Sequence, residues 1–271
     1  MAQIIQKNNV SVLTFSVFEK EPLIAAVSGR PGGVSEGPFS SLNMGFSVGD
    51  DESHVIENRK RFFDVLGAEA SQLINCRQVH GVRMEQAGRK DCGRGALSPD
   101  TAIADCDGLY TNEPGVPLTM NFADCVPLLL YDSVTHSIAL AHGGWRGSAG
   151  NIGGLAVQAL QRNFGALPEN IKAAIGPAIQ FKNFEVGEDV IKAFRLLFSE
   201  EEMQELCLEK ENGKYLFDLP GANRALFIKA GVLPSHIEDC HICTYGENDL
   251  FYSYRKAGGI TGRHMAVMML K

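Results

Sequence analysis

Residues 116–141 read VPLTMNFADCVPLLLYDSVTHSIALA, and this stretch indicates the fold more clearly than any other. It holds three short apolar runs, Val116–Phe122, Val126–Tyr131 and Ser137–Ala141, with polar or turn-forming residues between them. Runs this short and this apolar are typical of strands that are covered on both faces. We therefore predict three buried strands of one sheet.

The flanking sequence adds helices and more strands. After the third run, apolar residues recur at helical spacing over residues 152–160, which predicts an amphipathic helix. By the same patterns we predict further strands at Ser11–Val17, Leu23–Val27, Ile171–Ile175, His236–Ile242 and His264–Leu270. Further helices are predicted at Glu52–Leu66, Val186–Phe198, Glu201–Glu209 and Asn223–Ala230. Strands and helices alternate, so the expected fold class is mixed α/β (α+β).

Two segments lack this periodicity. Residues 28–50 are rich in Gly, Pro and Ser and predict turns and loops. Residues Glu85–Thr101, with three Gly and three basic residues, predict an exposed loop. No linker separates two halves of the chain. We expect a single layered domain over residues 1–271, with a mixed β-sheet flanked by helices.

Composition excludes several classes of protein. The chain has 271 residues, of which 25 are basic and 32 acidic, so its net charge is −7. Nucleic-acid binders normally carry a basic surplus, so no nucleic-acid partner is expected. There is no apolar run of about 18 residues for a membrane span and no signal-peptide pattern. Seven Cys form no evident disulfide framework. We expect a cytoplasmic protein without a membrane partner.

Standard catalytic and cofactor motifs are absent from the sequence. There is no Walker-type phosphate loop, dinucleotide-binding Gly-x-Gly-x-x-Gly, His-Glu-x-x-His or Gly-x-Ser-x-Gly. Cys240 and Cys243 have the spacing of half a zinc knuckle, but no second half accompanies them. We interpret them as thiols that pack in the core.

Candidate chemistry lies at the ends of the predicted strands. Cys125 comes just before one strand, and His142 comes just past another and is followed by the Gly-rich turn of residues 143–147. Loops at strand ends often form ligand sites, and His80 is a third candidate. The spacings of 45 and 17 residues match no local ligand pattern, however. On the residues alone, a core Cys and structural or surface His residues explain the pattern better than a metal site does.

Several ordered segments carry a resemblance to a known family. The sequence resembles the laccase-domain (YfiH-like) family, also named multicopper polyphenol oxidase or purine nucleoside phosphorylase. Gly143 departs from the pattern, since the family usually has Ala there. The matching segments are Ser28–Ser35, Gly37–Asn43, Gly49–Asp51, Glu57–Arg59, Gln78–Gly81, Ala123–Cys125, His142–Gly147, Ile175–Pro177, Phe184–Gly187, Cys243–Thr244, Phe251–Arg255 and Thr261–Arg263.

The resemblance implies that His80, Cys125 and His142 bind one metal ion, usually zinc. A thiolate and two imidazoles suit zinc, and three protein ligands leave a fourth position open, as in catalytic sites. Copper is also possible in such a site. Multicopper oxidation, by contrast, needs His-rich clusters, and this chain has seven His and no His-x-His. Any polyphenol oxidation would then be a weak activity of the copper-loaded site.

The resemblance also implies purine nucleoside chemistry. Family members cleave adenosine, inosine or methylthioadenosine with phosphate to a base and a ribose 1-phosphate, and they deaminate adenosine. The partners would be a small-molecule nucleoside and phosphate, and no protein partner is indicated. Arg30, Asn43 and Arg146 are candidates for phosphate and sugar contacts by motif membership and charge. Turn geometry or an ion pair would explain the same three residues equally well.

Two other functions stay open. The fold of the family resembles that of Cys-dependent deamidating toxins, and bacterial relatives are linked to editing of cell-wall precursors. The chain would then be a hydrolase that acts on peptidoglycan-related peptides, or a thiol hydrolase in which His142 activates Cys125 and no metal is required. The alternative to an enzyme is a metal- or partner-binding protein with a closed structural zinc site. Its fourth ligand would be His54, His136 or Cys76.

Overall fold

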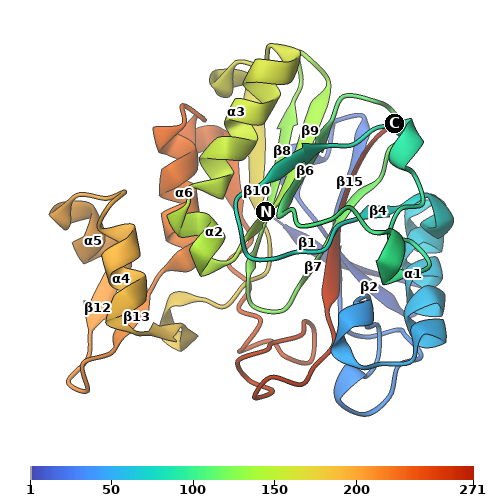
Figure 1. Cartoon of the computed structure of the whole chain (residues 1–271), viewed down its shortest axis with the longest axis horizontal. Helices are drawn as coiled ribbons and strands as arrows, with labels where there is room; N and C mark the ends of the chain where they lie inside the picture. Colours follow the sequence, from blue (N-terminus) through green and yellow to red (C-terminus); the bar gives the residue numbers. More distant parts are fainter. Residues whose placement is uncertain (1) are drawn as a thin grey trace.

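Two six-stranded β-sheets packed face to face form the centre of the structure, a computed structural model that describes residues 2–271 (Figure 1). Both sheets contain parallel and antiparallel pairs. In spatial order, the first sheet consists of β1 (Gln3–Lys7), β2 (Val10–Thr14), β3 (Leu23–Ser28), β15 (His264–Leu270), β7 (Leu118–Phe122) and β4 (Ile74–Asn75). The second sheet consists of β14 (Ile237–Asp239), β10 (Ile171–Ile175), β8 (Val126–Asp132), β9 (Ser137–Gly143), β6 (Gly108–Thr111) and β5 (Met84–Gln86).

The continuous apolar sequence of β8 follows from this layering. Alternate residues of a strand point to opposite faces of its sheet. Leu128 and Leu130 pack in the cluster beneath the helices of the second sheet. Leu129 and Tyr131 pack in the cluster between the two sheets. Both faces of the strand are buried, so no polar alternation appears in its sequence.

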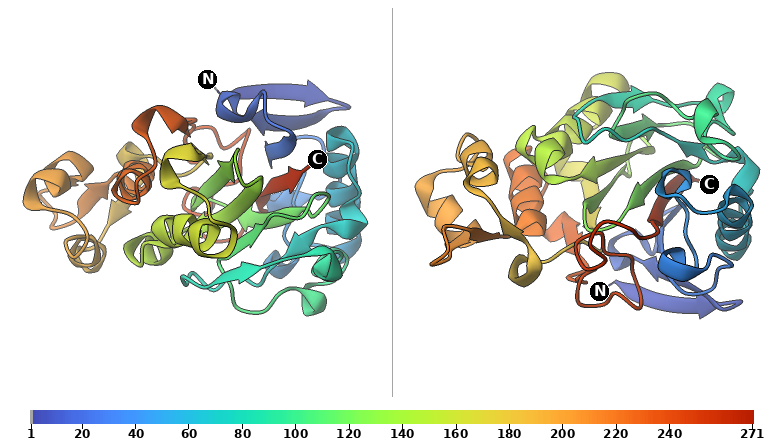
Figure 2. Two further views of the ribbon diagram at one scale, coloured as in Figure 1. Left: turned by 90° about the horizontal axis from the view of Figure 1, so that it is seen from above. Right: turned by 60° about the horizontal axis from the view of Figure 1, so that its bottom comes forward.

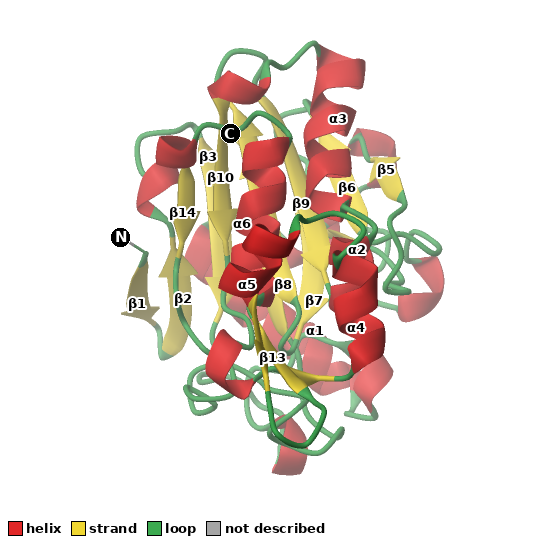
Figure 3. Ribbon diagram, turned by 90° about the vertical axis from the view of Figure 1, so that its left-hand side faces the viewer, coloured by secondary structure: helices red, strands yellow, loops and turns green. Residues whose placement is uncertain are grey.

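Helices cover the outer faces of both sheets. On the first sheet, α1 (Glu52–Leu66) buries Phe62 and Phe63 against β2 and β15. On the second sheet lie α3 (Ile152–Phe164) and α6 (Leu219–Lys229), with the short α2 (Trp145–Ala149) beside them (Figure 3). The ends of α1 are typical: the Asp51 side chain accepts a hydrogen bond from the Ser53 N–H, and Gly67 ends the helix at φ 71°.

A smaller unit stands at one end of the molecule (Figures 1 and 2). It has a three-stranded sheet in the order β11 (Glu185–Val186), β13 (Tyr215–Phe217) and β12 (Cys207–Glu209). It also contains α4 (Glu188–Phe194) and α5 (Glu200–Leu206). The predicted helices in this region are therefore too long, since α4 ends at Phe194 and the second helix gives way to β12.

The fold class is confirmed, but the number of sheets is not. The run at residues 116–122 forms β7, which pairs with β15 and β4 in the first sheet rather than with β8. An apolar run shows that a strand is buried, but it does not show which strand pairs with it. The single domain stays a prediction. Residues 2–271 contain no helix that is both long and apolar enough to cross a membrane.

Boundaries shift at two more predicted strands. The strand predicted at Ser11–Val17 ends at Thr14, and a 3₁₀ turn at Ser16–Phe18 follows it. The strand predicted at His236–Ile242 is limited to β14.

The prediction of an exposed loop at residues 85–101 is wrong in part. Ala87, Gly95 and Ala96 are buried. Ala87 packs in the cluster between the sheets. Gly95 and Ala96 are held by Arg59 of α1, whose buried guanidinium donates hydrogen bonds to their carbonyls at 2.5 Å and 2.8 Å. A cation in the core requires such acceptors, and the loop provides them. Composition alone gave no sign of this contact.

Candidate active site

One cavity of about 730 Å³ opens where the two sheets meet the loops that connect them. The three residues that the resemblance singled out, His80, Cys125 and His142, line it together. Their ligand atoms all lie within 4.8 Å of one another, and no other such group of three or more metal-binding side chains occurs within residues 2–271. Residues far apart in the sequence thus meet at one point.

Strand pairing explains how two of these residues come together. Cys125 lies in the short turn through which the chain passes from β7 in the first sheet to β8 in the second. His142 lies within β9 rather than past its end, and it pairs with Pro127 of β8. The register therefore places His142 two residues from Cys125 across the ladder.

His80 reaches the site from a loop that follows β4. Gln78 fastens this loop to β7, because its side-chain amide exchanges two hydrogen bonds of 2.9 Å with the backbone of Asn121. His80 itself has a φ of 60°, in the left-handed region that few side chains adopt. The ring of His80 lies edge-on to that of His142, with 4.9 Å between the centroids.

The charge state of His142 depends on two neighbours. Burial lowers the pKa of its imidazole, but the Cys125 thiolate and a hydrogen bond of 2.8 Å between Nδ1 and Asp107 Oδ1 outweigh burial and raise it to about 9. The pKa of the Asp107 carboxyl is raised by burial but lowered overall by the hydrogen bond from His142 and those from the backbone of residues 79 and 81. Asp107 therefore stays ionised.

Cys125 is held as a thiolate. Burial raises the pKa of its thiol, but the charge of His142 and hydrogen bonds from His142 and His80 outweigh this effect and lower the pKa to about 6. A thiolate is the form of Cys that binds metals and attacks electrophiles. At neutral pH the site thus pairs an anionic sulfur with a protonated His142, and a metal ion would replace the proton on Nε2 of His142.

Gly144 leaves room for the cluster. A Cβ atom at this position would lie 3.1 Å from Cys125 Sγ and 3.2 Å from His80 Cδ2. We expect Gly144→Ala to weaken zinc binding by at least about tenfold, because ligand orientation governs metal affinity. Gly143→Ala is the matched control, since its Cβ would contact only Val126 and Leu128. Titration against a chelator measures both variants; equal affinities would contradict this account.

The cavity is also lined by cationic side chains. Arg263 donates from Nη1 to the carbonyls of Thr261 and Gly262, and Arg255 donates from Nη1 to the Glu185 carbonyl. Both guanidinium groups donate to carbonyls there, while Asp124 and the Cys125 thiolate line the same cavity and stabilise the charge of Arg263. Arg59 and Arg77 line the cavity too, although Arg77 pairs with Asp105 at 2.8 Å. A protein with a net charge of −7 therefore presents a positively charged pocket.

The three predicted substrate contacts lie elsewhere. Arg30 donates to Ser40 O and Asn248 and lies over the Tyr252 ring, which is a structural role. Arg146 is exposed and lies over the neighbouring Trp145 ring. Neither residue lines the cavity. The motifs that suggested these residues also contain glycine-rich turns with a structural role. Membership of a motif therefore does not by itself identify a ligand contact.

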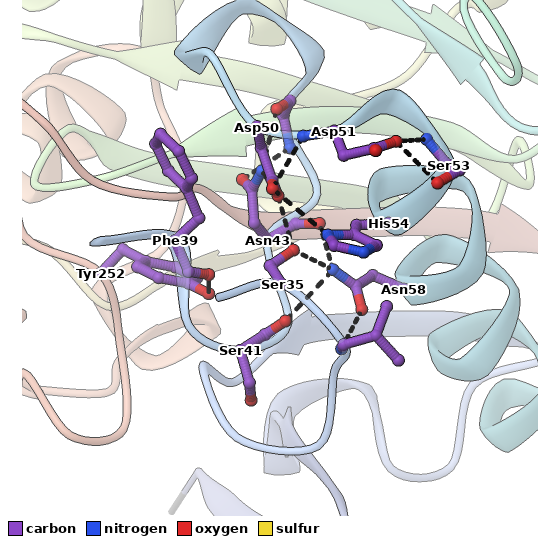
Figure 4. A network of polar contacts seen from close by, with 12 residues as sticks. Ser35, Phe39, Ser41, Asn43, Asp50, Asp51, Ser53, His54, Asn58 and Tyr252 are labelled. Atoms are coloured by element: carbon purple, nitrogen blue, oxygen red, sulfur yellow. Dashed lines mark hydrogen bonds and ion pairs between the residues drawn. The ribbon is translucent and has the colours of Figure 1, made fainter. Parts of the chain in front are cut away.

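Asn43 is a buried structural residue in a network of polar contacts with Asp50 and Asn58 (Figure 4). Its side-chain amide donates to Gly45 O and Asp50 Oδ2, and its Oδ1 accepts from the backbone N–H of Arg263 at 2.8 Å. It is not among the residues that line the cavity. Asn43 therefore holds Arg263 rather than a ligand.

None of the proposed fourth ligands joins the cluster. His54 lies 3.6 Å from Asp50, His136 hydrogen-bonds to Tyr131 Oη, and Cys76 donates to the Cys106 carbonyl. In residues 2–271, Cys240 and Cys243 belong to no group of metal-binding side chains either. The cluster thus has three protein donors, the number typical of an open catalytic site.

Two functional candidates were not found from the sequence. Asp124 lines the cavity next to Cys125, and its carboxylate accepts hydrogen bonds from Thr244 Oγ1 and the Arg255 N–H. Its place in the Ala123–Cys125 segment was the available signal. Nothing in the sequence indicated a role for Asp107, since it lies in none of the segments that match the family.

The fold and site define a class: a mixed α/β protein with two packed sheets and one Cys–His₂ cluster in a cationic cavity. The family described as "Multi-copper polyphenol oxidoreductase laccase" matches residues 24–271. The chain belongs to this family. The match covers the second sheet, the whole cluster and the first sheet from β3 onward, but not β1 or β2.

Similar proteins carry names from purine metabolism. The chain is 41% identical over 248 residues to "Purine nucleoside phosphorylase YlmD" of Geobacillus stearothermophilus, with 90% of each chain covered. It is 42% identical to a Deinococcus radiodurans purine nucleoside phosphorylase, covering 90% of this chain and 88% of the relative. "Adenosine deaminase RL5" of an unknown prokaryotic organism is 33% identical, covering 83% and 85%.

Solved structures agree with the fold. The crystal structure of Geobacillus stearothermophilus YlmD superposes with a TM-score of 0.94 at 37% identity over 100% of both chains. Neisseria meningitidis protein NMB0706 superposes with a TM-score of 0.78 at 29% identity, covering 100% of this chain and 99% of the other. The two-sheet architecture is therefore shared with these relatives.

Proposed function

We propose that this chain is a zinc-dependent purine nucleoside enzyme, which cleaves adenosine, inosine or methylthioadenosine with phosphate and also deaminates adenosine. The observation that carries the proposal is the Cys–His₂ cluster at the wall of a cationic cavity. The names of the relatives give the substrate class. Localisation in the cytoplasm stays a prediction.

The residues present fit a metal ion. The donor set is a thiolate with two imidazoles, and the absence of a side chain at Gly144 keeps the space beside Cys125 Sγ open. His80, Cys125 and His142 would hold the ion. Zinc so bound supplies Lewis acidity, which activates water or polarises a substrate oxygen. Copper fits the same donors, and weak polyphenol oxidation is our proposal for that form.

The cavity wall suits both substrates. Phe46, Phe184 and Tyr254 line it and offer flat apolar faces for a purine ring. The Nη2 groups of Arg255 and Arg263 take no part in the hydrogen bonds described above. These two groups are our candidates for phosphate binding. The guanidinium of Arg255 lies 5.5 Å from the centre of the Phe184 ring, which orients it. Asp124, which precedes Cys125 in the chain and lines the cavity, provides an acidic group for a ribose hydroxyl.

Product analysis tests the proposal directly. Zinc-loaded protein is incubated with adenosine, with and without phosphate, and the products are separated by chromatography. Adenine that forms only with phosphate establishes phosphorolysis, and inosine in both samples establishes deamination. If neither forms, the purine proposal is wrong, and cell-wall peptides are the next substrates.

Replacing Arg255 separates the two reactions. We expect Arg255→Ala to lower kcat/KM for phosphate by roughly 10- to 100-fold, the worth of a hydrogen bond to a charged group. Deamination needs no phosphate and should change little. Arg146→Ala is the control, because its exposed side chain lies outside the cavity. Equal losses in both reactions would mean that Arg255 supports the fold of the cavity instead.

The low pKa of Cys125 also favours a second candidate, a thiol hydrolase. In that mechanism the thiolate attacks a carbonyl and His142 returns the proton to the leaving group. Full activity after chelation of metal, with loss of activity after thiol alkylation, would support it. Loss of activity on chelation, restored by zinc, would exclude it.

A further inference from the structure

Asp107 contacts both histidines of the cluster. It is fully buried on the turn before β6, and its carboxylate accepts four hydrogen bonds. Oδ1 accepts from the His80 backbone N–H at 3.0 Å and from His142 Nδ1 at 2.8 Å. Oδ2 accepts from the backbone N–H groups of Val79 (3.1 Å) and Gly81 (2.7 Å).

The contact with His80 acts on the backbone. Three consecutive N–H groups, of residues 79 to 81, converge on one carboxylate. They fix the turn that holds His80 at its φ of 60°. Such a conformation costs free energy and persists only where other contacts enforce it. Asp107 supplies that enforcement.

The contact with His142 acts on the ring. A carboxylate accepts hydrogen bonds only, so Nδ1 must carry the proton. Nε2 is then the nitrogen that faces Cys125. Its lone pair would bind a metal ion in place of the proton that Nε2 otherwise carries. A second bond, from the His142 backbone N–H to Asp107 O at 2.8 Å, fixes the strand beside it.

We propose that Asp107 is the positioning residue of the metal centre: one carboxylate sets the tautomer of His142 and the backbone conformation of His80 at once. The inference rests on the proposed metal site but not on purine turnover. Outer carboxylates of this kind orient metal-bound imidazoles in many proteins, and their loss typically weakens metal binding 10- to 100-fold. Here one residue serves two ligands, which makes it more sensitive to substitution than a carboxylate that serves one.

Asp107→Asn is the most informative variant, because it keeps the shape and removes one acceptor. If its NH₂ group faces Val79 and Gly81, the turn of His80 loses two hydrogen bonds. If it faces His142, Nδ1 must accept, the proton moves to Nε2, and that nitrogen cannot bind metal. The second orientation also removes the acceptor of the His80 N–H, so either orientation of the amide impairs at least one ligand.

Asp132→Asn is the matched control. Asp132 is equally buried, and it accepts from the backbone N–H groups of Val134 and Thr135, at the opposite end of the β8–β9 pair. Both variants lose a buried carboxylate, so both are expected to unfold at lower temperature. A merely structural role for Asp107 predicts that the two behave alike in every measurement.

Metal binding is the readout, by chelator competition with zinc and by the visible spectrum of the cobalt-loaded protein. We expect Asp107→Asn to bind zinc about 10- to 100-fold more weakly and to lose intensity in the cobalt ligand-field bands. Asp132→Asn should match the wild type in both. Wild-type affinity and spectrum in Asp107→Asn would overturn the proposal. These readouts need no purine substrate, so a failure to form adenine or inosine would overturn only the proposed function.

The tautomer is measurable in the wild type if Asp107→Asn does not fold. In the zinc-loaded protein, nitrogen-15 NMR of the assigned His142 ring should show a protonated Nδ1. A protonated Nε2, or metal bound through Nδ1, would overturn the proposal.

Discussion

Cys125→Ala is expected to lose bound zinc, from about one ion per chain to near zero, together with all nucleoside turnover. Two imidazoles hold zinc far more weakly than a thiolate with two imidazoles, and a bound thiolate is also the anionic donor of the site. The protein should stay folded, because removing one sulfur from a half-buried side chain costs only about 1–2 kcal/mol. Elemental analysis, circular dichroism and the adenosine assay measure the three quantities. His80→Ala and His142→Ala should behave in the same way.

Cys92→Ala is the control for this prediction. Cys92 is also a free, half-buried thiol, but it lies outside the cavity. It should keep both zinc and activity. Turnover that persists in zinc-free Cys125→Ala would rule out the zinc mechanism and the thiol mechanism together.

The second large effect concerns acid stability and comes from His264. Its ring is fully buried on β15, stacked on Phe122 with Phe251 at its edge, and neither ring nitrogen has a hydrogen-bond partner. Burial, reinforced by the charge of Arg263, lowers the pKa of this imidazole from 6.5 to about 3. Folding therefore keeps His264 neutral at a pH where the unfolded chain would protonate it.

The sign of the pH dependence follows. Between pH 6.5 and 3 the unfolded state binds the proton and the folded state does not, so the free energy of unfolding falls as the pH falls. From pH 6.5 to 4.5 this single group should remove about 2 kcal/mol of stability. His264→Leu should flatten the stability profile by that amount in urea denaturation of chelator-treated protein. Parallel profiles for wild type and His264→Leu would refute the assignment.

Much of the fold was predictable because burial leaves a direct trace in the sequence. The helix predicted at Glu52–Leu66 and the strands at Ile171–Ile175 and His264–Leu270 have the predicted bounds. The partner of each strand was not predictable. β7 and β8 are adjacent in the chain and equally apolar, yet they belong to different sheets. Pairing is decided by long-range packing, which a local pattern does not contain.

The residues of the candidate site were also predictable only in part. His80, Cys125 and His142 came from a resemblance, since their spacing alone matched no ligand pattern, and the structure brings all three together. Asp107 was missed because its partners are backbone N–H groups and one ring nitrogen, and none of these contacts has a signature in the sequence. Arg30 and Asn43 were chosen by charge and motif, but their hydrogen bonds to the backbone show that they maintain loops.

The small unit around β13 is joined to the cavity at its base. Phe184, immediately before β11, lines the cavity, and the Glu185 carbonyl accepts the hydrogen bond of Arg255. His80, Cys125 and His142 all come from other parts of the chain. Insertions or deletions in this unit would therefore change which molecules are accepted while the reaction chemistry stays the same. For protein engineering, residues 184–217 are the segment to exchange between relatives when a new specificity is wanted.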